Sequence, residues 1–204
     1  MMSAPPLVTA MGRLLGDPPA GNIGIMGSPR TAVKLAADGY NIFTAATTAS
    51  EAKSLNAKGT ALVATNGDTK KEGRLSTVHC RPETLPFLPH SLDILFAVSV
   101  LGSHKIPHIS ETIASWKRTI RPGGLFAIAE LAGEGRVGRF MLRLARRIRG
   151  RPKNLEPADL CGLLLRAGVG EINQVWPQGI GSWMLTYGTC GSLSDIQSRS
   201  DTTK

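Results

Sequence analysis

The sequence predicts an α/β protein with a doubly wound, mostly parallel sheet, and three observations within residues 83–131 lead to this prediction. Leu92–Val98 is an apolar run without alternation, as in a strand that is covered on both faces. Leu125–Leu131 is a second run of the same kind. Between them, four apolar residues recur at the spacing of one helical stripe. The residues of this stripe are Ile109, Ile113, Trp116 and Ile120.

A short turn separates the helix from the second strand. Arg121-Pro122 ends the helix, and Gly123-Gly124 makes the turn. Strand, helix and strand within about forty residues form a βαβ crossover. We therefore expect the strands at 92–98 and 125–131 to be parallel.

The elements before this unit follow the same alternation. Gly21–Met26 is a short strand, and Ser28 is the N-cap of a helix that has Pro29 at its first position and ends at Gly39. Tyr40–Ala45 is a second strand. Thr48 and Glu51 then have the spacing of a capping box, for a helix that runs to about Ala57. Residues 58–74 are either a small hairpin around Asn66-Gly67 or a long loop, and Leu75–Cys80 is the third strand.

The chain after residue 131 contributes two helices and two strands to the prediction. A basic helix covers about 138–148, and a further helix covers Glu156–Ala167. Strands at Glu171–Val175 and Ser182–Tyr187 complete the domain. We place the domain at 21–190, between a disordered leader at 1–20 and a disordered tail at 191–204.

Three short pieces flank the two apolar runs: Leu85-Pro86-Phe87 and Ser91-Leu92-Asp93 at the run 92–98, and Arg121–Leu125 before the run 125–131. These pieces resemble class I S-adenosylmethionine (SAM)-dependent methyltransferases of the type 11-like group. The first two are similar to the family's approach to its fourth strand, and the third is similar to its turn into the fifth. The resemblance implies a seven-stranded, Rossmann-like sheet with an antiparallel last strand. It also implies SAM as the cofactor, held at the carboxyl ends of the strands.

The family's cofactor motif is degenerate in this chain. Of its glycine-rich turn only Gly27 remains, or Gly24 as well if the register slides. The acid that binds the ribose falls on Ala45 or Ala46, and the acid near the adenine falls on Arg81, although Glu83 is close. A tight structural turn is the alternative interpretation of the glycines. By resemblance, the residues that would line the cofactor are Gly24, Gly27, Ser28, Glu83, Thr84, Val98 and Ser99.

Two residues are weak candidates for a catalytic base. Methyl transfer is a direct displacement that needs alignment and, for some acceptors, a base. His104 follows the fourth strand and Glu130 closes the fifth. A solvated loop histidine and an acid that faces a helix or a partner remain the alternatives.

Positive charge is concentrated in one segment. The net charge is +9, and residues 136–153 hold eight Arg or Lys residues and no acid, so 9 − 8 leaves +1 for the rest of the chain. An acidic protein, RNA phosphate or an anionic membrane surface could bind there, and a lid helix with solvated arginines is the alternative. The arginines that we expect to contact such a partner are Arg139, Arg143, Arg146 and Arg147.

Composition narrows the class of protein further. Three scattered cysteines argue against a disulfide framework and for a reducing compartment. His104 and His108 flank Pro107, so we expect no metal site. No apolar run is long enough to cross a bilayer. We expect a cytoplasmic protein, although residues 1–16 contain Arg13 and no acid, a pattern that organelle-import leaders share.

These observations leave three functional hypotheses. The first is a divergent SAM-dependent methyltransferase that acts on a small or anionic acceptor. The second, which the missing acids favour, is a protein with the methyltransferase fold that has lost the cofactor and serves as a binding or scaffold subunit. The third is a module that associates with RNA or an anionic membrane through 136–153.

Overall fold

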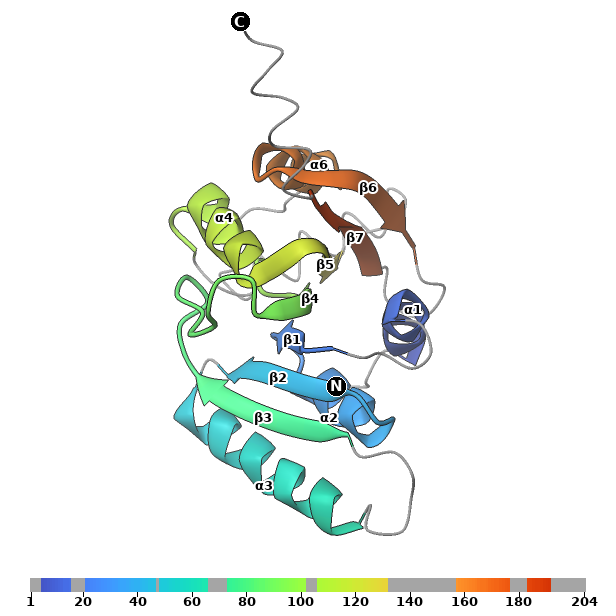
Figure 1. Ribbon diagram of the computed structural model, residues 1–204, viewed down its shortest axis with the longest axis vertical. Helices are drawn as coiled ribbons and strands as arrows, with labels where there is room; N and C mark the ends of the chain where they lie inside the picture. The colour runs from blue at the N-terminus through green and yellow to red at the C-terminus, as the bar shows by residue number, and fades with distance from the viewer. Residues whose placement is uncertain are drawn as a thin grey trace, which may run out of the picture.

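A seven-stranded sheet with helices on both faces forms the body of the protein (Figure 1). The computed structural model describes residues 5–15, 21–46, 48–65, 73–101, 106–131, 157–176 and 183–191. The strands are β1 (Ile23–Met26), β2 (Asn41–Ala46), β3 (Arg74–His79), β4 (Leu92–Val98), β5 (Ile120–Leu131), β6 (Val169–Val175) and β7 (Trp183–Cys190). The helices are α1 (Pro5–Leu15), α2 (Pro29–Ala37), α3 (Ala49–Thr65), α4 (Ile109–Thr119) and α6 (Pro157–Arg166).

The strand order is β3-β2-β1-β4-β5-β7-β6. The first five of these strands are mutually parallel, and β7 is antiparallel to both β5 and β6. The predicted crossover from β4 through α4 to a parallel β5 is confirmed. The α/β class, the mostly parallel sheet and the antiparallel last strand are confirmed as well.

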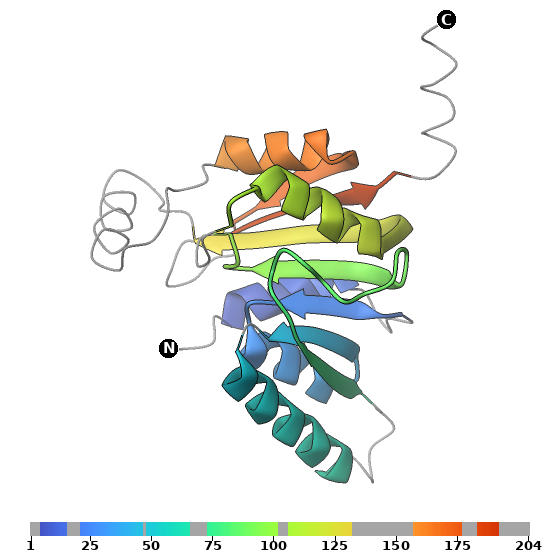
Figure 2. The ribbon, with the colours of Figure 1, turned by 90° about the vertical axis from the view of Figure 1, so that its left-hand side faces the viewer.

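Two apolar layers hold the helices against the sheet. Ile113 and Trp116 of α4 and Leu160 and Leu164 of α6 belong to one layer. The other layer contains side chains of α1 and α2, and a small cluster between α2, α3 and the sheet extends it. Figure 2 shows α4 in front of the sheet and α1 behind it. The apolar runs of β4 and β5 lie between the layers, which explains why they lack alternation.

The amino-terminal segment differs from the prediction. Residues 5–15, which we expected to lie in a disordered leader, form α1. Leu7, Val8, Met11 and Leu15 are buried in the layer behind the sheet. Their spacing places them on one helical face, and two prolines occupy the first turn, where no intrahelical donor is needed. Burial of this face therefore orders a segment whose composition indicated a loop.

The helix after β2 is also longer than predicted. It was expected to end at about Ala57, but α3 continues to Thr65. The prediction of a hairpin or loop is therefore wrong for residues 58–65, while 66–72 lie outside the described residues. Gly59 explains the close packing of α3 on β3, because a Cβ at this position would lie 2.9 Å from the carbonyl oxygen of Leu75.

The turn predicted at Gly123-Gly124 lies inside β5 instead of before it. Ile120 already pairs with Leu92, and the register then shifts so that Leu125 pairs with Ile94. The extra residues form a bulge, in which Gly123 adopts a φ of +76°. The helix α4 therefore passes directly into the strand.

The carboxyl-terminal elements agree with the prediction apart from their ends. β6 and β7 were expected at 171–175 and 182–187 and span 169–175 and 183–190. The predicted basic helix at 138–148 and residues 192–204 of the predicted tail lie outside the described residues. None of the helices in the described ranges has the length and apolar character to span a bilayer.

Candidate functional site

The parallel strands end together at one edge of the sheet. β1 has β2 on one side and β4 on the other, so the order of the strands reverses at β1. In open α/β sheets, ligands bind outside the carboxyl ends of the strands at this switch point. We name as the carboxyl edge the residues Gly27–Ser28 after β1, Ala46 of β2, Ser99–Leu101 after β4 and Glu130 of β5.

Gly27 allows β1 to turn tightly against β4. Its φ is +77°, and a Cβ at this position would collide with the carbonyl oxygen of Val98. The glycine is therefore needed to let two backbones approach. Gly24 lies within β1, where a Cβ would lie 2.8 Å from two leucine side chains of β4. Of the two predicted glycines, only Gly27 reaches the carboxyl edge.

Ser28 begins α2 at the predicted N-cap position, with Pro29 next. Its hydroxyl does not cap the helix but forms a hydrogen bond of 2.7 Å with the hydroxyl of Thr31. Ser28 is half-buried and Thr31 is buried. The two side chains therefore bind each other at the start of α2.

The end of β2 is apolar. Ala45 and Ala46 are 6% and 0% exposed, and Ala46 packs in a cluster with Ala52 and Leu55 of α3. The ribose-binding acid of the resemblance falls at one of these two alanines. A carboxylate there would lose its hydration without gaining a partner among the cluster side chains.

The cap of α3 provides the acid nearest in sequence to this strand end. The backbone N–H of Glu51 donates to the hydroxyl oxygen of Thr48 at 3.2 Å, which confirms the first half of the predicted capping box. Glu51 is half-buried in the first turn of α3. From the sequence, Glu51 was predicted only as part of this capping box.

Glu83 and Thr84 lie in the connection between β3 and β4. The N–H of Thr84 donates to the carbonyl oxygen of Arg81 at 3.1 Å, which closes a turn. The indole N–H of Trp116 donates to the carbonyl oxygen of Pro82 at 2.6 Å. The Trp116 contact holds Pro82, and with it the adjacent Glu83 and Thr84, against α4 on one face of the sheet. Arg81 is exposed.

The turn that follows β4 is held by hydrogen bonds that its N–H groups donate to β5. Val98 is buried in the core, so its backbone, and not its side chain, faces the carboxyl edge. Ser99 has a φ of +54°, and its N–H donates to the carbonyl oxygen of Ala129 at 2.7 Å. Glu130 is 4% exposed, and its Oε1 accepts a hydrogen bond of 2.9 Å from the N–H of Leu101.

Other predicted site residues lie outside the described residues. They are His104, Arg139, Arg143, Arg146 and Arg147. Among the described residues, no group of three or more His, Cys, Asp or Glu side chains gathers as metal ligands would.

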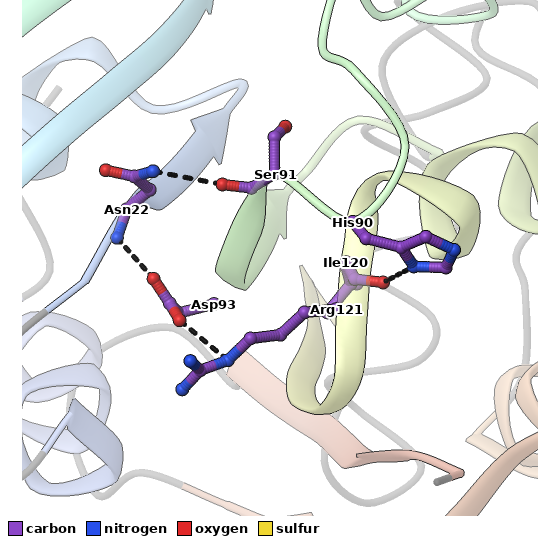
Figure 3. Close-up of polar contacts among 6 residues, drawn as sticks. All are labelled: Asn22, His90, Ser91, Asp93, Ile120 and Arg121. Atoms are coloured by element: carbon purple, nitrogen blue, oxygen red, sulfur yellow. Dashed lines mark hydrogen bonds and ion pairs between the residues drawn. The ribbon is translucent and has the colours of Figure 1, made fainter. Parts of the chain in front are cut away.

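A polar network that the sequence did not reveal lies at the opposite, amino edge of the sheet (Figure 3). The carboxylate of Asp93 accepts hydrogen bonds from the N–H of Asn22 at 2.6 Å and from Nε of Arg121 at 2.7 Å. The ring nitrogen Nδ1 of His90 lies 3.1 Å from the carbonyl oxygen of Ile120. Asp93 is the one acid in the apolar run of β4. This isolated charge is the sequence feature from which the network could have been predicted.

This network gives the resemblance motifs a structural role. Asp93 belongs to the piece that resembles the approach to the fourth strand, and Arg121 begins the piece that resembles the turn into the fifth. Together they join β1, β4 and the bulge of β5. Asp93 and Arg121 therefore serve the sheet at its amino edge, away from the carboxyl edge.

The residues that define the carboxyl edge offer no exposed carboxylate to the nucleoside of SAM, and in this respect they do not fit it. Ala46 offers no acceptor to the ribose hydroxyls and is fully buried. Glu130 is a carboxylate, but it is buried and already accepts the Leu101 N–H. The hydroxyl of Ser28 is engaged by Thr31. The backbone at Gly27 and Ser99 can still contact a ligand. It supplies few of the hydrogen bonds that specific recognition of a nucleoside requires.

Comparisons with known proteins identify relatives of this fold. The sequence profile of the methyltransferase domain family matches residues 27–128. A SAM-dependent methyltransferase from Methanosarcina mazei superposes with a TM-score of 0.66 at 14% identity, over 84% of this chain and 93% of that one. A search of curated protein sequences found no match.

Two further structures are similar and were solved with bound molecules. One is a complex between a methyltransferase and the Haloferax volcanii Trm112 methyltransferase activator (TM-score 0.60, 18% identity, 84% of this chain and 83% of that one). The other is geranyl diphosphate C-methyltransferase from Streptomyces coelicolor with Mg²⁺, geranyl diphosphate and S-adenosyl-L-homocysteine (0.66, 11%, 89% and 78%). At these identities the likeness shows the fold.

Proposed function

Because the chain belongs to the methyltransferase domain family of class I SAM-dependent methyltransferases, we propose that it is a member without effective cofactor binding that serves as a binding or scaffold subunit. The observation that carries this proposal is the fully buried Ala46 in its apolar cluster with Ala52 and Leu55. The position is not simply an acid replaced by a small residue. It is packed as part of the core between β2 and α3.

The energetic consequence follows from the ribose hydroxyls. Each ribose hydroxyl that lacks its charged acceptor weakens the binding free energy of the cofactor by on the order of 1–3 kcal/mol. Two such losses weaken a micromolar complex towards the millimolar range, since about 1.4 kcal/mol is a factor of ten in affinity. The surviving glycine does not offset this cost, because Gly27 allows the contact between β1 and β4 whether or not a ligand is present.

Calorimetric titration with SAM and with S-adenosylhomocysteine tests this proposal. We expect dissociation constants above about 1 mM for both molecules. Submillimolar binding would overturn the proposal. In that case Glu51→Gln and Glu83→Gln, which change the two nearby acids of the described chain, identify which of them has taken over the ribose contact.

An active methyltransferase on an anionic acceptor is the second candidate function. It is favoured by the family membership and by the described elements on either side of the basic segment, because β5 ends and α6 begins toward the same edge of the sheet (Figure 2). Residues 132–156, which hold eight of the 24 Arg and Lys residues, connect these two elements in the sequence. The related Streptomyces enzyme was solved with a diphosphate substrate. Turnover of SAM with a phosphorylated acceptor would establish this function, and His104 is then the first residue to test as a base.

A partner could also bind the basic segment without any methyl transfer. The candidates are an acidic protein, RNA phosphate and an anionic membrane surface, and a related methyltransferase was solved with a protein activator. Replacement of Arg143, Arg146 and Arg147 by Glu should abolish association with RNA and with anionic vesicles, because the attraction depends on charge. Unchanged association would exclude the RNA and membrane alternatives.

A further inference from the structure

Glu130 is a carboxylate buried at the end of a core strand. It is 4% exposed, and its neighbours in β5, Ile128 and Ala129, are buried apolar residues. Its partner across the antiparallel ladder is Met184, which is also buried. A buried carboxylate is costly unless hydrogen bonds compensate for its lost hydration. Its contacts therefore indicate what the residue does.

The contact of the Glu130 side chain crosses to the turn after β4. Oε1 accepts the N–H of Leu101 at 2.9 Å, and the carbonyl oxygen of the preceding residue, Ala129, accepts the N–H of Ser99 at 2.7 Å. β5 thus binds both ends of Ser99–Leu101. The turn needs this support, because Ser99 has a φ of +54°, which a non-glycine residue adopts at a cost.

The turn held in this way lies directly against the end of β1. Val100, in its middle, is 1% exposed, and its Cγ2 would lie 2.7 Å from a Cβ built on Gly27. The carbonyl oxygen of Val98 lies on the same side of Gly27. The position of the Gly27–Ser28 backbone therefore depends on the turn, and the position of the turn depends on β5.

We propose that Glu130 is the positioning residue of the carboxyl edge. Its carboxylate fixes Leu101, and through Val100 it sets the surface that Gly27 and Ser28 present to a ligand. In this role Glu130 touches no ligand and transfers no proton. Its oxygen acts here as the hydrogen-bond acceptor of the Leu101 N–H. Glu130 acts in this way whichever ligand the edge takes.

Amide exchange and amide chemical shifts measured by NMR on the full chain test this role. Glu130→Leu keeps the approximate shape and removes the acceptor, so exchange of the Leu101 amide should become about tenfold faster or more. The amide signals of Gly27 and Ser28 should shift as well. Glu130→Gln keeps a carbonyl oxygen, so the exchange rate and the signals should stay close to the wild-type values.

Matched variants separate this role from a general effect on stability. Glu111→Gln removes an exposed acid in the first turn of α4 and should change none of these amides. Val100→Ala should shift the Gly27 signal while Leu101 remains protected. If Glu130→Leu does not fold, Glu130→Gln and Val100→Ala decide the question. These readouts need no ligand, so they are independent of SAM binding.

Three results would overturn the role of Glu130. The first is unchanged Leu101 exchange in Glu130→Leu. The second is fast exchange in Glu130→Gln, because the charge and not the acceptor would then be required. The third is an unshifted Gly27 signal in Val100→Ala, because the turn would then not support the end of β1.

Discussion

Gly27 and Gly123 form a matched pair that tests why a glycine remains at the carboxyl edge. Both have nearly the same φ, +77° and +76°. A Cβ on Gly123 would meet nothing within 4 Å, whereas a Cβ on Gly27 would collide with the carbonyl oxygen of Val98. Alanine therefore introduces the same backbone strain at both positions and a steric conflict at only one.

The expected costs follow from these two terms. Alanine in the left-handed region costs about 1–2 kcal/mol, and this is the whole effect that we expect for Gly123→Ala. Overpacking against fixed neighbours adds about 1–3 kcal/mol, so Gly27→Ala should lower the free energy of unfolding by about 2–5 kcal/mol in total. In a domain of this size each kcal/mol lowers Tm by about 2–4 °C.

Urea unfolding followed by tryptophan fluorescence measures both variants. The prediction is the difference between them, since strain common to both positions cancels. Equal costs would mean that Gly27 does not serve the contact between β1 and β4. The glycine would then be available for a ligand, and a working cofactor turn would become the better interpretation.

Three further predictions concern the amino edge, α1 and a buried thiol. Asp93→Ala should destabilise the protein by about 2 kcal/mol in urea unfolding, because the half-buried carboxylate also accepts the N–H of Asn22. Arg121→Ala should cost less than about 1 kcal/mol, because the Arg121 side chain is largely exposed; the reverse order would refute the assignment. Met11→Ala should cost about 2–5 kcal/mol, because Met11 is fully buried; a cost near zero would mean that α1 is not docked. Burial raises the pKa of Cys190 from 9.0 to about 11, although Lys117 opposes the shift. The resulting stability is complete below pH 9 and is lost as the pH rises towards 11, because the unfolded chain ionises first. Urea midpoints across this range should fall less steeply in Cys190→Ala, and an identical slope would contradict the assignment.

The strands and helices that position the site could largely be predicted from the sequence. Leu92–Val98 and Leu125–Leu131 are apolar throughout because both faces of these strands are covered, and this local pattern is independent of the distant chain. α1 could not be predicted in this way. The ordering of α1 depends on its burial against strands that come later in the sequence. This tertiary packing outweighs a composition that is typical of loops.

The candidate site was harder to predict, because its contacts join residues that are distant in sequence. The pairing of Glu130 with the Leu101 N–H depends on the register of β4 and β5, and the sequence alone does not fix that register. That the resemblance places an alanine, and no acid, at the ribose position could be seen at Ala45 and Ala46 without any structure. That Ala46 is packed into the core against α3 became clear only from its neighbours.

The most direct measurement is an NMR titration of the labelled protein with S-adenosylhomocysteine, following the amides of Gly27, Ser28 and Ser99. If the carboxyl edge no longer binds the nucleoside effectively, these signals should show no saturation up to about 1 mM ligand. Shifts confined to these three amides that saturate well below that concentration would show that the edge binds the cofactor, and the account of a non-catalytic family member would then be wrong.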